Sequence, residues 1–232
     1  MVTKESASEI PRIAEGVFFT TPPRLPRGPH GLARDEVIRS HSERMMIAFT
    51  ELIASHGYAA VGVKEIVDRS SVSRSAFYMC FDSKESCAEA AYARFISVLV
   101  TEMSASIVHQ SSEDVFAVLA TYLATLGSDL VVARAFQVEM DAAGPRARER
   151  RRQALRGLAA LLHAELGRQA QSDPDLDPDV SMEALVGAVY AVRQVASDLL
   201  DTEAEPDLEA VAPRLHRWLD NSLRKPRRAS TR

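Results

Sequence analysis

Apolar residues recur every three or four positions along most of the chain after residue 34, which is the spacing of amphipathic α-helices. The first helix is predicted to begin near Asp35 or at Ser40, where Ser40 and Glu43 have the spacing of a capping box. It should end at Gly57, because glycine readily adopts the left-handed conformation that terminates helices. The apolar face of this helix consists of Ile38, His41, Met45, Ala48, Phe49, Leu52 and Ile53.

Two short helices are predicted next, at 64–70 and 74–80, separated by the tight turn Ser71-Val72-Ser73. Ser73 is a favourable N-cap for the second of them. Two short helices joined by a three-residue turn after a longer helix have the spacing of a helix-turn-helix, although three helices of an ordinary bundle fit the same spacing. The side chains expected to pack against the first helix are Ile66, Val67, Val72, Ala76 and Phe77. Those left free to meet base edges in a major groove are Arg74, Ser75, Tyr78 and Met79.

The rest of the chain shows the same helical periodicity. Asp82 and Glu85 offer a capping pair for a long helix that runs to Ile107. Gly144-Pro145 breaks the chain later, and an acidic loop that contains proline follows at 172–179. Further helices are expected at 113–126, 129–142, 145–171, 181–200 and 206–224.

Composition favours the same fold class. Apolar residues make up 46% of the 232 residues, aromatic residues only 6%, and alanine, leucine and valine are abundant. Alanine and straight-chain residues lose little entropy in a helix, so this mixture favours packed helices over sheets. We therefore expect an all-α protein, with a three-helix helix-turn-helix domain at 35–83 and a larger helical domain at 84–225.

The formal net charge of −4 neither supports nor excludes DNA binding, because a DNA-reading face needs only local positive charge. Over 64–85, four basic residues are balanced by four acidic ones. Residues 1–34 contain five prolines and are predicted to form an extended basic arm, and 226–232 a basic tail. The arm would either follow the DNA through its arginines or be a disordered tail. Its basic residues next to the first helix are Arg24, Arg27 and Arg34.

Other classes of protein find little support. Two cysteines, Cys80 and Cys87, are too few for a disulfide framework; small buried residues are the simpler interpretation, and a thiol sensor the alternative. No apolar run is long enough to span a bilayer and no signal peptide is recognised, so we expect a cytoplasmic protein without membrane contact. The chain shows no paired histidines, nucleophile triad, P-loop or dinucleotide fingerprint, so no enzyme activity, cofactor or metal is expected.

Two charged segments look like sites but have simpler interpretations. Asp173, Asp175 and Asp177 resemble the start of a calcium loop, yet Pro178 stands where such a loop needs glycine. A solvated acidic loop is expected instead. The arginine-rich run at 146–156 is interrupted by glutamate and has the period of a solvated helix face, with a second nucleic-acid surface as the alternative.

The region from Gly57-Tyr58 to the Phe81-Asp82-Ser83-Lys84-Glu85 segment resembles the DNA-binding domain of TetR-family regulators. Between these ends stand Val63-Lys64-Glu65-Ile66-Val67 and Ser70-Ser71-Val72-Ser73-Arg74-Ser75-Ala76-Phe77-Tyr78. The resemblance implies that 73–79 enter the major groove and that Tyr78 and Lys84 contact phosphates. Val63, Ser71 and Cys80 depart from the threonine, glycine and histidine common in the family. The predicted DNA-binding residues are Lys64, Ser73, Arg74, Ser75, Ala76, Tyr78, Met79 and Lys84, with Arg24, Arg27 and Arg34 of the arm.

The resemblance also implies a homodimer on a pseudo-palindromic DNA operator and an effector site in the second domain. Dimerisation would use the last two helices, at 181–200 and 206–224, although part of their apolar surface must be intramolecular core. The predicted interface residues are Leu185, Val189, Val192, Leu215, Trp218 and Leu219. The predicted ligand-binding residues are Phe95, Phe116, Tyr122, Arg134, Phe136, Met140, Tyr190 and Gln194.

The sequence thus predicts a ligand-responsive transcription regulator, in particular a repressor that leaves its operator when a small apolar effector binds. An architectural DNA binder without a ligand is the competing class, and an enzyme built on the same helices is a third. The identity of the effector and the operator sequence stay open.

Overall fold

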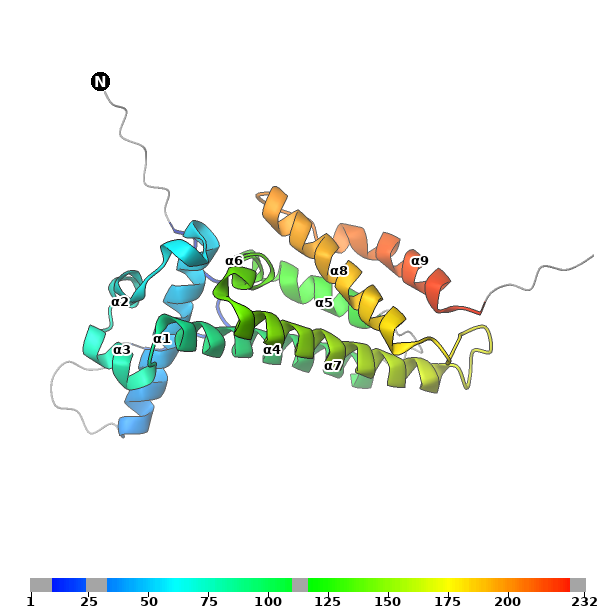
Figure 1. Cartoon of the computed structure of the whole chain (residues 1–232), viewed down its shortest axis with the longest axis horizontal. Helices are drawn as coiled ribbons and strands as arrows, with labels where there is room; N and C mark the ends of the chain where they lie inside the picture. Colours follow the sequence, from blue (N-terminus) through cyan, green and yellow to red (C-terminus); the bar gives the residue numbers. More distant parts are fainter. Residues whose placement is uncertain (1–9, 24–32, 110–116, 226–232) are drawn as a thin grey trace, which may run out of the picture. The chain divides into compact units, whose positions relative to one another are not determined.

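The structure is a computed structural model that describes residues 10–23, 33–109 and 117–225, without the side chains of 107–109. Within these residues the chain forms nine α-helices and no β-strand, so the predicted all-α class is confirmed (Figure 1). The helices are α1 (Arg34–His56), α2 (Val63–Ser70), α3 (Arg74–Cys80), α4 (Lys84–His109), α5 (Ala117–Gly127), α6 (Leu130–Gln137), α7 (Pro145–Gln169), α8 (Met182–Thr202) and α9 (Ala212–Leu223). Three short 3₁₀ turns accompany them, η1 (Tyr58–Ala60), η2 (Glu139–Ala143) and η3 (Glu209–Val211).

The described chain divides into two compact units. The first holds the residues up to Phe95 together with Asp129–Ala143, and the second holds Ile96–Ser128 and the residues from Gly144 onward. This differs from the expected boundary at 83/84, because the beginning of α4 and all of α6 group with the helix-turn-helix. Helical periodicity shows which face of a helix is buried but not which partner buries it.

In the first unit, α1 packs against α2, α3 and α6. Phe49 and Ile53 of α1, Ile66 of α2 and Phe77 of α3 are fully buried, so they form one core beneath the two short helices. Because α1 begins at Arg34, the start near Asp35 is confirmed and the alternative cap at Ser40 is wrong.

Local capping sets the limits of the short helices. Ser71 ends α2 with left-handed dihedrals (φ 55°, ψ 38°), and the Ser73 hydroxyl accepts a hydrogen bond from Ala76 N–H at 3.2 Å. The predicted limits of α3, 74–80, are confirmed. The expected Asp82/Glu85 pair does not cap α4. Ser83 and Ser86 cap each other, since each backbone N–H donates to the other's hydroxyl, at 3.1 and 3.3 Å.

The segment before α1 is packed rather than extended. Ile13, Phe18 and Phe19 are all buried, and Gly16 turns the chain with a positive φ of 89°. The prediction of an extended arm is therefore wrong for residues 10–23: three large apolar side chains close together in sequence bury themselves despite the nearby prolines. Arg24 and Arg27 lie outside the described residues, and Arg34 is exposed as the first residue of α1.

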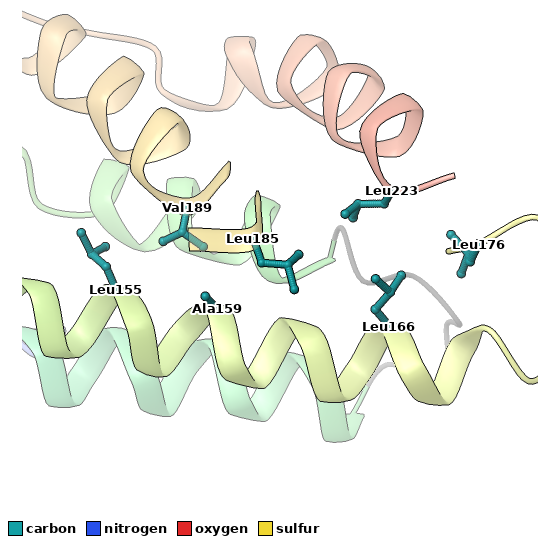
Figure 2. Packing of buried hydrophobic residues seen from close by; sticks show 7 residues of the cluster. All are labelled: Leu155, Ala159, Leu166, Leu176, Leu185, Val189 and Leu223. Atoms are coloured by element: carbon teal, nitrogen blue, oxygen red, sulfur yellow. The ribbon is translucent and has the colours of Figure 1, made fainter. Parts of the chain in front are cut away.

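In the second unit, α7 packs along α8, and α9 packs against α5. Figure 2 shows the leucine-rich core between α7, α8 and the end of α9. In the first unit, the helix expected at 129–142 is replaced by two elements, since α6 stops at Gln137 and η2 follows it. In the second unit, α9 begins at Ala212, whereas the sequence predicted a start at 206. The buried residues of this core are Leu155, Ala159, Leu166, Leu176, Leu185, Val189 and Leu223.

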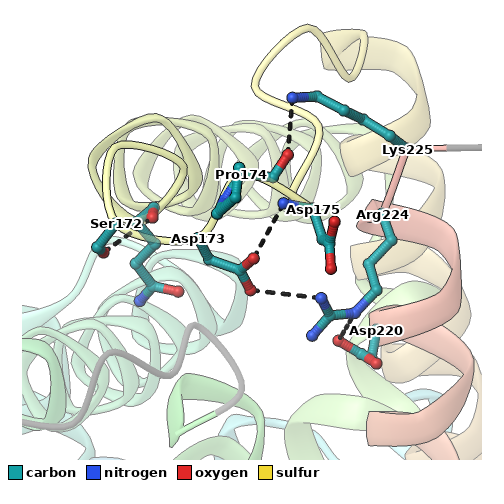
Figure 3. Close-up of polar contacts among 8 residues, drawn as sticks. Ser172, Asp173, Pro174, Asp175, Asp220, Arg224 and Lys225 are labelled. Carbon is teal, nitrogen blue, oxygen red and sulfur yellow. Dashed lines mark hydrogen bonds and ion pairs between the residues drawn. The ribbon is translucent and has the colours of Figure 1, made fainter.

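The acidic loop after α7 is fastened to the end of α9 (Figure 3). The Arg224 guanidinium pairs with Asp173 at 3.3 Å and with Asp220 at 2.8 Å, and the Lys225 ammonium donates to the Pro174 carbonyl at 2.8 Å. The aspartates that resemble a calcium loop are thus used in turns and ion pairs, and no cluster of metal-binding side chains occurs in the described residues.

No single helix of the described part is both long and apolar enough to cross a membrane. Only α5 and α6 taken together, as a bent pair, meet that criterion, and they do so by length and composition alone.

Candidate DNA-binding surface and ligand cavity

Helix α3 presents a polar and aromatic face to solvent. Tyr78 and Met79 are 49% and 53% exposed, while Phe77 beside them is fully buried. Ala76 is also buried at 6%, so its side chain belongs to the core under α3 and not to the DNA-binding set in which the sequence placed it. The surface residues of this helix and its cap are Ser73, Arg74, Ser75, Tyr78 and Met79.

The exposed side chains of α3 and its cap contact one another, which restricts their conformations. The Arg74 guanidinium carbon lies 5.9 Å from the centre of the Tyr78 ring, which is within reach of a cation–π interaction. The hydroxyls of Ser73 and Ser75 hydrogen-bond at 3.0 Å. A planar guanidinium already held on a ring loses less freedom when it meets a guanine edge or a phosphate.

Helix α2 begins with a cap that offsets the missing threonine. The Glu65 carboxylate accepts a hydrogen bond from Gly62 N–H at 3.0 Å; a hydrogen bond from its own backbone N–H, and then that from Gly62, lower the pKa of Glu65. Lys64 stands on the exposed side of this first turn and pairs with Asp68 at 3.2 Å. Because both side chains are largely exposed, this pair is weak, and Lys64 can exchange it for a phosphate.

Lys84 is the first residue of α4, as the sequence implied. Its ammonium donates to the Tyr58 carbonyl at 3.1 Å, so the side chain is held at the junction of α1 and α2. Burial, and then the neighbouring Glu85 carboxylate, raises the pKa of Tyr58 to about 12.

The sequence of the region that contains α2 and α3 matches the model of a known protein family. The family model described as "Bacterial regulatory proteins, tetR family" matches residues 48–91, from the second half of α1 through α2 and α3 into α4. Residues 48–91 therefore form a DNA-binding domain of the TetR type. The match identifies α2 and α3 as the helix-turn-helix of that domain.

Solved structures of TetR-type regulators share the fold over both units. The fatty acid degradation regulator FadR from Bacillus halodurans is 18% identical with a TM-score of 0.70, covering 80% of this chain and 97% of that one. FadR from Bacillus subtilis, in complex with stearoyl-CoA, is 18% identical with a TM-score of 0.67, covering 76% and 96%. NalD from Pseudomonas aeruginosa, the secondary repressor of the MexAB-OprM multidrug efflux pump, is 16% identical with a TM-score of 0.64, covering 81% and 98%. At these identities the likeness shows the fold alone, and a sequence search of curated proteins gave no match.

The second unit contains an apolar cavity of about 60 Å³. Side chains from α4, α5, α7, α8 and α9 line it, and apart from Tyr122 and Arg193 those among the described residues are apolar. Arg193 is only 8% exposed, and because the wall has almost no polar surface, it lines the cavity with its aliphatic stem. Representative lining residues are Met103, Leu119, Leu158, Ala188, Val189 and Leu219.

Most predicted ligand-binding residues lie elsewhere. Tyr122 lines the cavity, but Phe95 and Phe136 stack in the core of the first unit, with ring centres 5.1 Å apart, and Met140 is buried in that unit too. Their aromatic and apolar character predicted burial correctly but not the unit that buries them. Arg134 also belongs to α6 in the first unit, and Phe116 lies outside the described residues.

Two further candidates sit on α8 outside the cavity wall. Gln194 is exposed and donates to Asp198 at 2.7 Å, while Tyr190 packs against the leucine-rich core. The polar wall residue on this helix is Arg193, one position before Gln194. Sequence reasoning missed it because a shift of one residue turns the side chain by about 100° around a helix.

The predicted interface residues also separate into two groups. Leu185, Val189 and Val192 are at most 8% exposed and line the cavity, so they face the interior of their own chain. Leu215 and Leu219 are half-buried, and Leu219 lines the cavity as well. Trp218 is 44% exposed and remains a candidate for contact with a second copy.

The two cysteines differ in accessibility. Cys87 is fully buried, and burial raises the pKa of its thiol well above the usual range, so it is unreactive. Cys80 is half-buried, with its sulfur 3.7 Å from the Ile38 carbonyl oxygen.

Proposed function

We propose that this protein is a homodimeric repressor that leaves its operator when a small apolar molecule enters the cavity of the second unit. The observation that carries the proposal is the apolar cavity itself, on the same chain as an exposed recognition helix. Repression is proposed because NalD, one of the similar structures, is described as a repressor.

The size of the cavity supports a mechanism by population shift. A water-sized sphere needs about 15 Å³, so a cavity of about 60 Å³ is much too small for a long acyl chain. A ligand of that size therefore binds only a rearranged state in which the surrounding helices have separated. A ligand that binds one state better than another shifts the equilibrium toward that state.

Long acyl compounds are the first ligand class to test. The wall is almost wholly apolar, which suits a hydrocarbon chain. The FadR protein of similar fold from Bacillus subtilis was solved with stearoyl-CoA, which belongs to this class.

Dimerisation is proposed through the exposed faces of α8 and α9. Leu185, Val189 and Val192 of α8 point inward, and its outer face carries small residues, Ala184, Gly187 and Ala191. Small side chains allow two helices to approach closely. The exposed Trp218 on α9 supplies the large apolar surface that an interface needs at its centre.

The experiment measures operator release. An operator selected from random DNA with the full-length protein is titrated, with and without stearoyl-CoA and shorter acyl thioesters. We expect weaker DNA binding with ligand and a rise in melting temperature, since a ligand at 100 times its Kd adds about 2.7 kcal/mol. Ala188→Leu fills the cavity wall and should keep DNA binding but lose the response; Ala160→Leu, exposed on α7, is the matched control. DNA binding unaffected by every ligand in the series would favour the architectural binder.

A further inference from the structure

Residues 10–23 form a compact turn that lies outside the matched family region. The turn closes through Gly16 N–H, which donates to the Phe19 carbonyl at 2.8 Å. The Glu15 carboxylate accepts from both the hydroxyl and the backbone N–H of Thr21, and these hydrogen bonds lower the pKa of Glu15. The segment is thus ordered by its own contacts as well as by those it makes with the first unit.

This segment is attached to α1 and α2 through one buried carboxylate. Glu51 of α1 is only 5% exposed and accepts a hydrogen bond from Ile13 N–H at 3.3 Å. The same carboxylate pairs at 2.7 Å with Arg69 of α2, whose guanidinium also donates to the Ile10 carbonyl at 3.4 Å. The Glu51 carboxylate therefore joins α2, α1 and residues 10–13.

A second buried carboxylate attaches the segment to α6. Asp129 is 4% exposed and caps α6, because its Oδ1 accepts from Val132 N–H at 3.0 Å. Its Oδ2 accepts from Ala14 N–H at 2.8 Å. Both oxygens of a carboxylate that is out of contact with water are thus satisfied, and one of the two donors comes from the segment.

Aromatic packing completes the attachment. Phe18 is 2% exposed and stacks on Phe95 of α4, with ring centres 5.4 Å apart. Phe95 in turn packs against Phe136 of α6. Residues 10–23 therefore contact α1, α2, α4 and α6, four elements that meet in the first unit.

We propose that residues 10–23 are a strap that positions α6 against the helix-turn-helix, so that operator affinity depends on Phe18 and Asp129 although neither belongs to the DNA-reading face. The sequence suggested that the N-terminal region acts through its charge. The packing assigns residues 10–23 a different role, because their contacts with the first unit are apolar groups and backbone hydrogen bonds. This proposal rests on operator binding as the function.

The test separates positioning from direct DNA contact. Phe18→Ala removes the aromatic contact. Asp129→Asn keeps one side-chain oxygen, which can still accept from Val132 N–H and cap α6. Its new amide NH₂ group then faces Ala14 N–H, and two donors cannot form a hydrogen bond. The matched control is Val17→Ala, since Val17 is 37% exposed in the same turn. Operator affinity is measured at several salt concentrations, together with hydrogen exchange of the 130–137 amides.

Phe18→Ala and Asp129→Asn should each bind operator about tenfold more weakly, with faster exchange in α6 and an unchanged slope of log affinity against log salt. Val17→Ala should behave as the wild type. A slope shallower by about one unit for each phosphate lost would show direct DNA contact and overturn the proposal. Unchanged affinity with faster exchange would also overturn it, since residues 10–23 would then stabilise α6 without affecting operator binding. If Phe18→Ala fails to fold, Asp129→Asn decides, and failure of the wild type to select any operator would refute the proposed function instead.

Discussion

The Lys84 ammonium lies 4.0 Å from the centre of the Tyr58 ring, while it donates to the carbonyl of the same residue. The ring is fixed from behind by Phe49, whose ring meets it edge-on at 6.2 Å, and Tyr58 N–H donates to Glu139 at 3.2 Å. The residue implied as a phosphate contact is therefore placed by the junction of α1 and α2. A cation held over an aromatic face gains roughly 0.5–2 kcal/mol, depending on its exposure.

Replacement of the Tyr58 ring should weaken operator binding without removing any DNA contact. Tyr58→Leu removes the ring but keeps the backbone carbonyl, so Lys84 retains one of its two contacts, and operator affinity should fall about threefold to tenfold, equivalent to roughly 0.7–1.4 kcal/mol. Tyr58→Phe keeps the ring and should bind nearly as the wild type. Fluorescence anisotropy with a labelled operator measures both. Equal affinity of Tyr58→Leu and wild type, with a large loss for Lys84→Ala, would mean that the ring does not position the ammonium.

Ser71 offers a direct test of the turn between α2 and α3. In the described part of the chain it is the one non-glycine residue with a positive φ, 55°. Glycine adopts this conformation without strain, so Ser71→Gly should raise the free energy of unfolding by up to about 1 kcal/mol, or about 2–4 °C in Tm. Ser97→Gly, exposed within α4, should instead lower it by about 0.5 kcal/mol. A Tm that falls with Ser71→Gly would show that the hydroxyl contributes more than the strain costs.

The predictions that succeeded rest on local signals. Ser73 as a cap and the limits of α3 follow from residues within a few positions of one another, so the sequence contains them in full. The attachment of α6 to the first unit could not be predicted in this way, because Asp129 and Ala14 are far apart in sequence and no periodicity links them. The same holds for Phe95 and Phe136, whose burial was predictable although their neighbours were not. In the N-terminal region the prolines predicted an extended chain, whereas the apolar residues Ile13, Phe18 and Phe19 were the available signal for packing.

The position of Arg74 over the Tyr78 ring allows separate tests of the hydroxyl and the ring of Tyr78. Tyr78→Phe keeps the ring under Arg74 and loses one hydroxyl assigned to phosphate, so affinity should fall by about 1 kcal/mol for all operator sequences alike. Tyr78→Ala also releases Arg74 and should change sequence preference, as Arg74→Ala and Ser75→Ala do. Selection from random DNA with each variant measures preference. A changed preference for Tyr78→Phe, with only uniform losses for the Arg74 and Ser75 variants, would reverse the orientation assigned to α3.

The proposed dimer can be tested at a pair of matched glycines. Gly187 on α8 and Gly157 on α7 are both exposed within helices, and a Cβ built on either meets no atom within 4 Å. A large residue at either position is thus tolerated by the single chain, and by helix propensity alone it stabilises the helix by up to about 1 kcal/mol. Gly187→Arg places a long charged side chain on the proposed interface, whereas Gly157→Arg does not.

We expect Gly187→Arg to be a folded monomer by light scattering at micromolar concentration, with operator binding strongly reduced because a two-fold operator needs both copies. Trp218→Asp should give the same result through loss of the exposed ring, and Gly157→Arg should remain dimeric with wild-type affinity. The three variants together separate the interface from general effects of charge on a helix surface. A Gly187→Arg protein that stays dimeric while Trp218→Asp dissociates would place the interface on α9 alone, and dimers in all three would remove both helices from it.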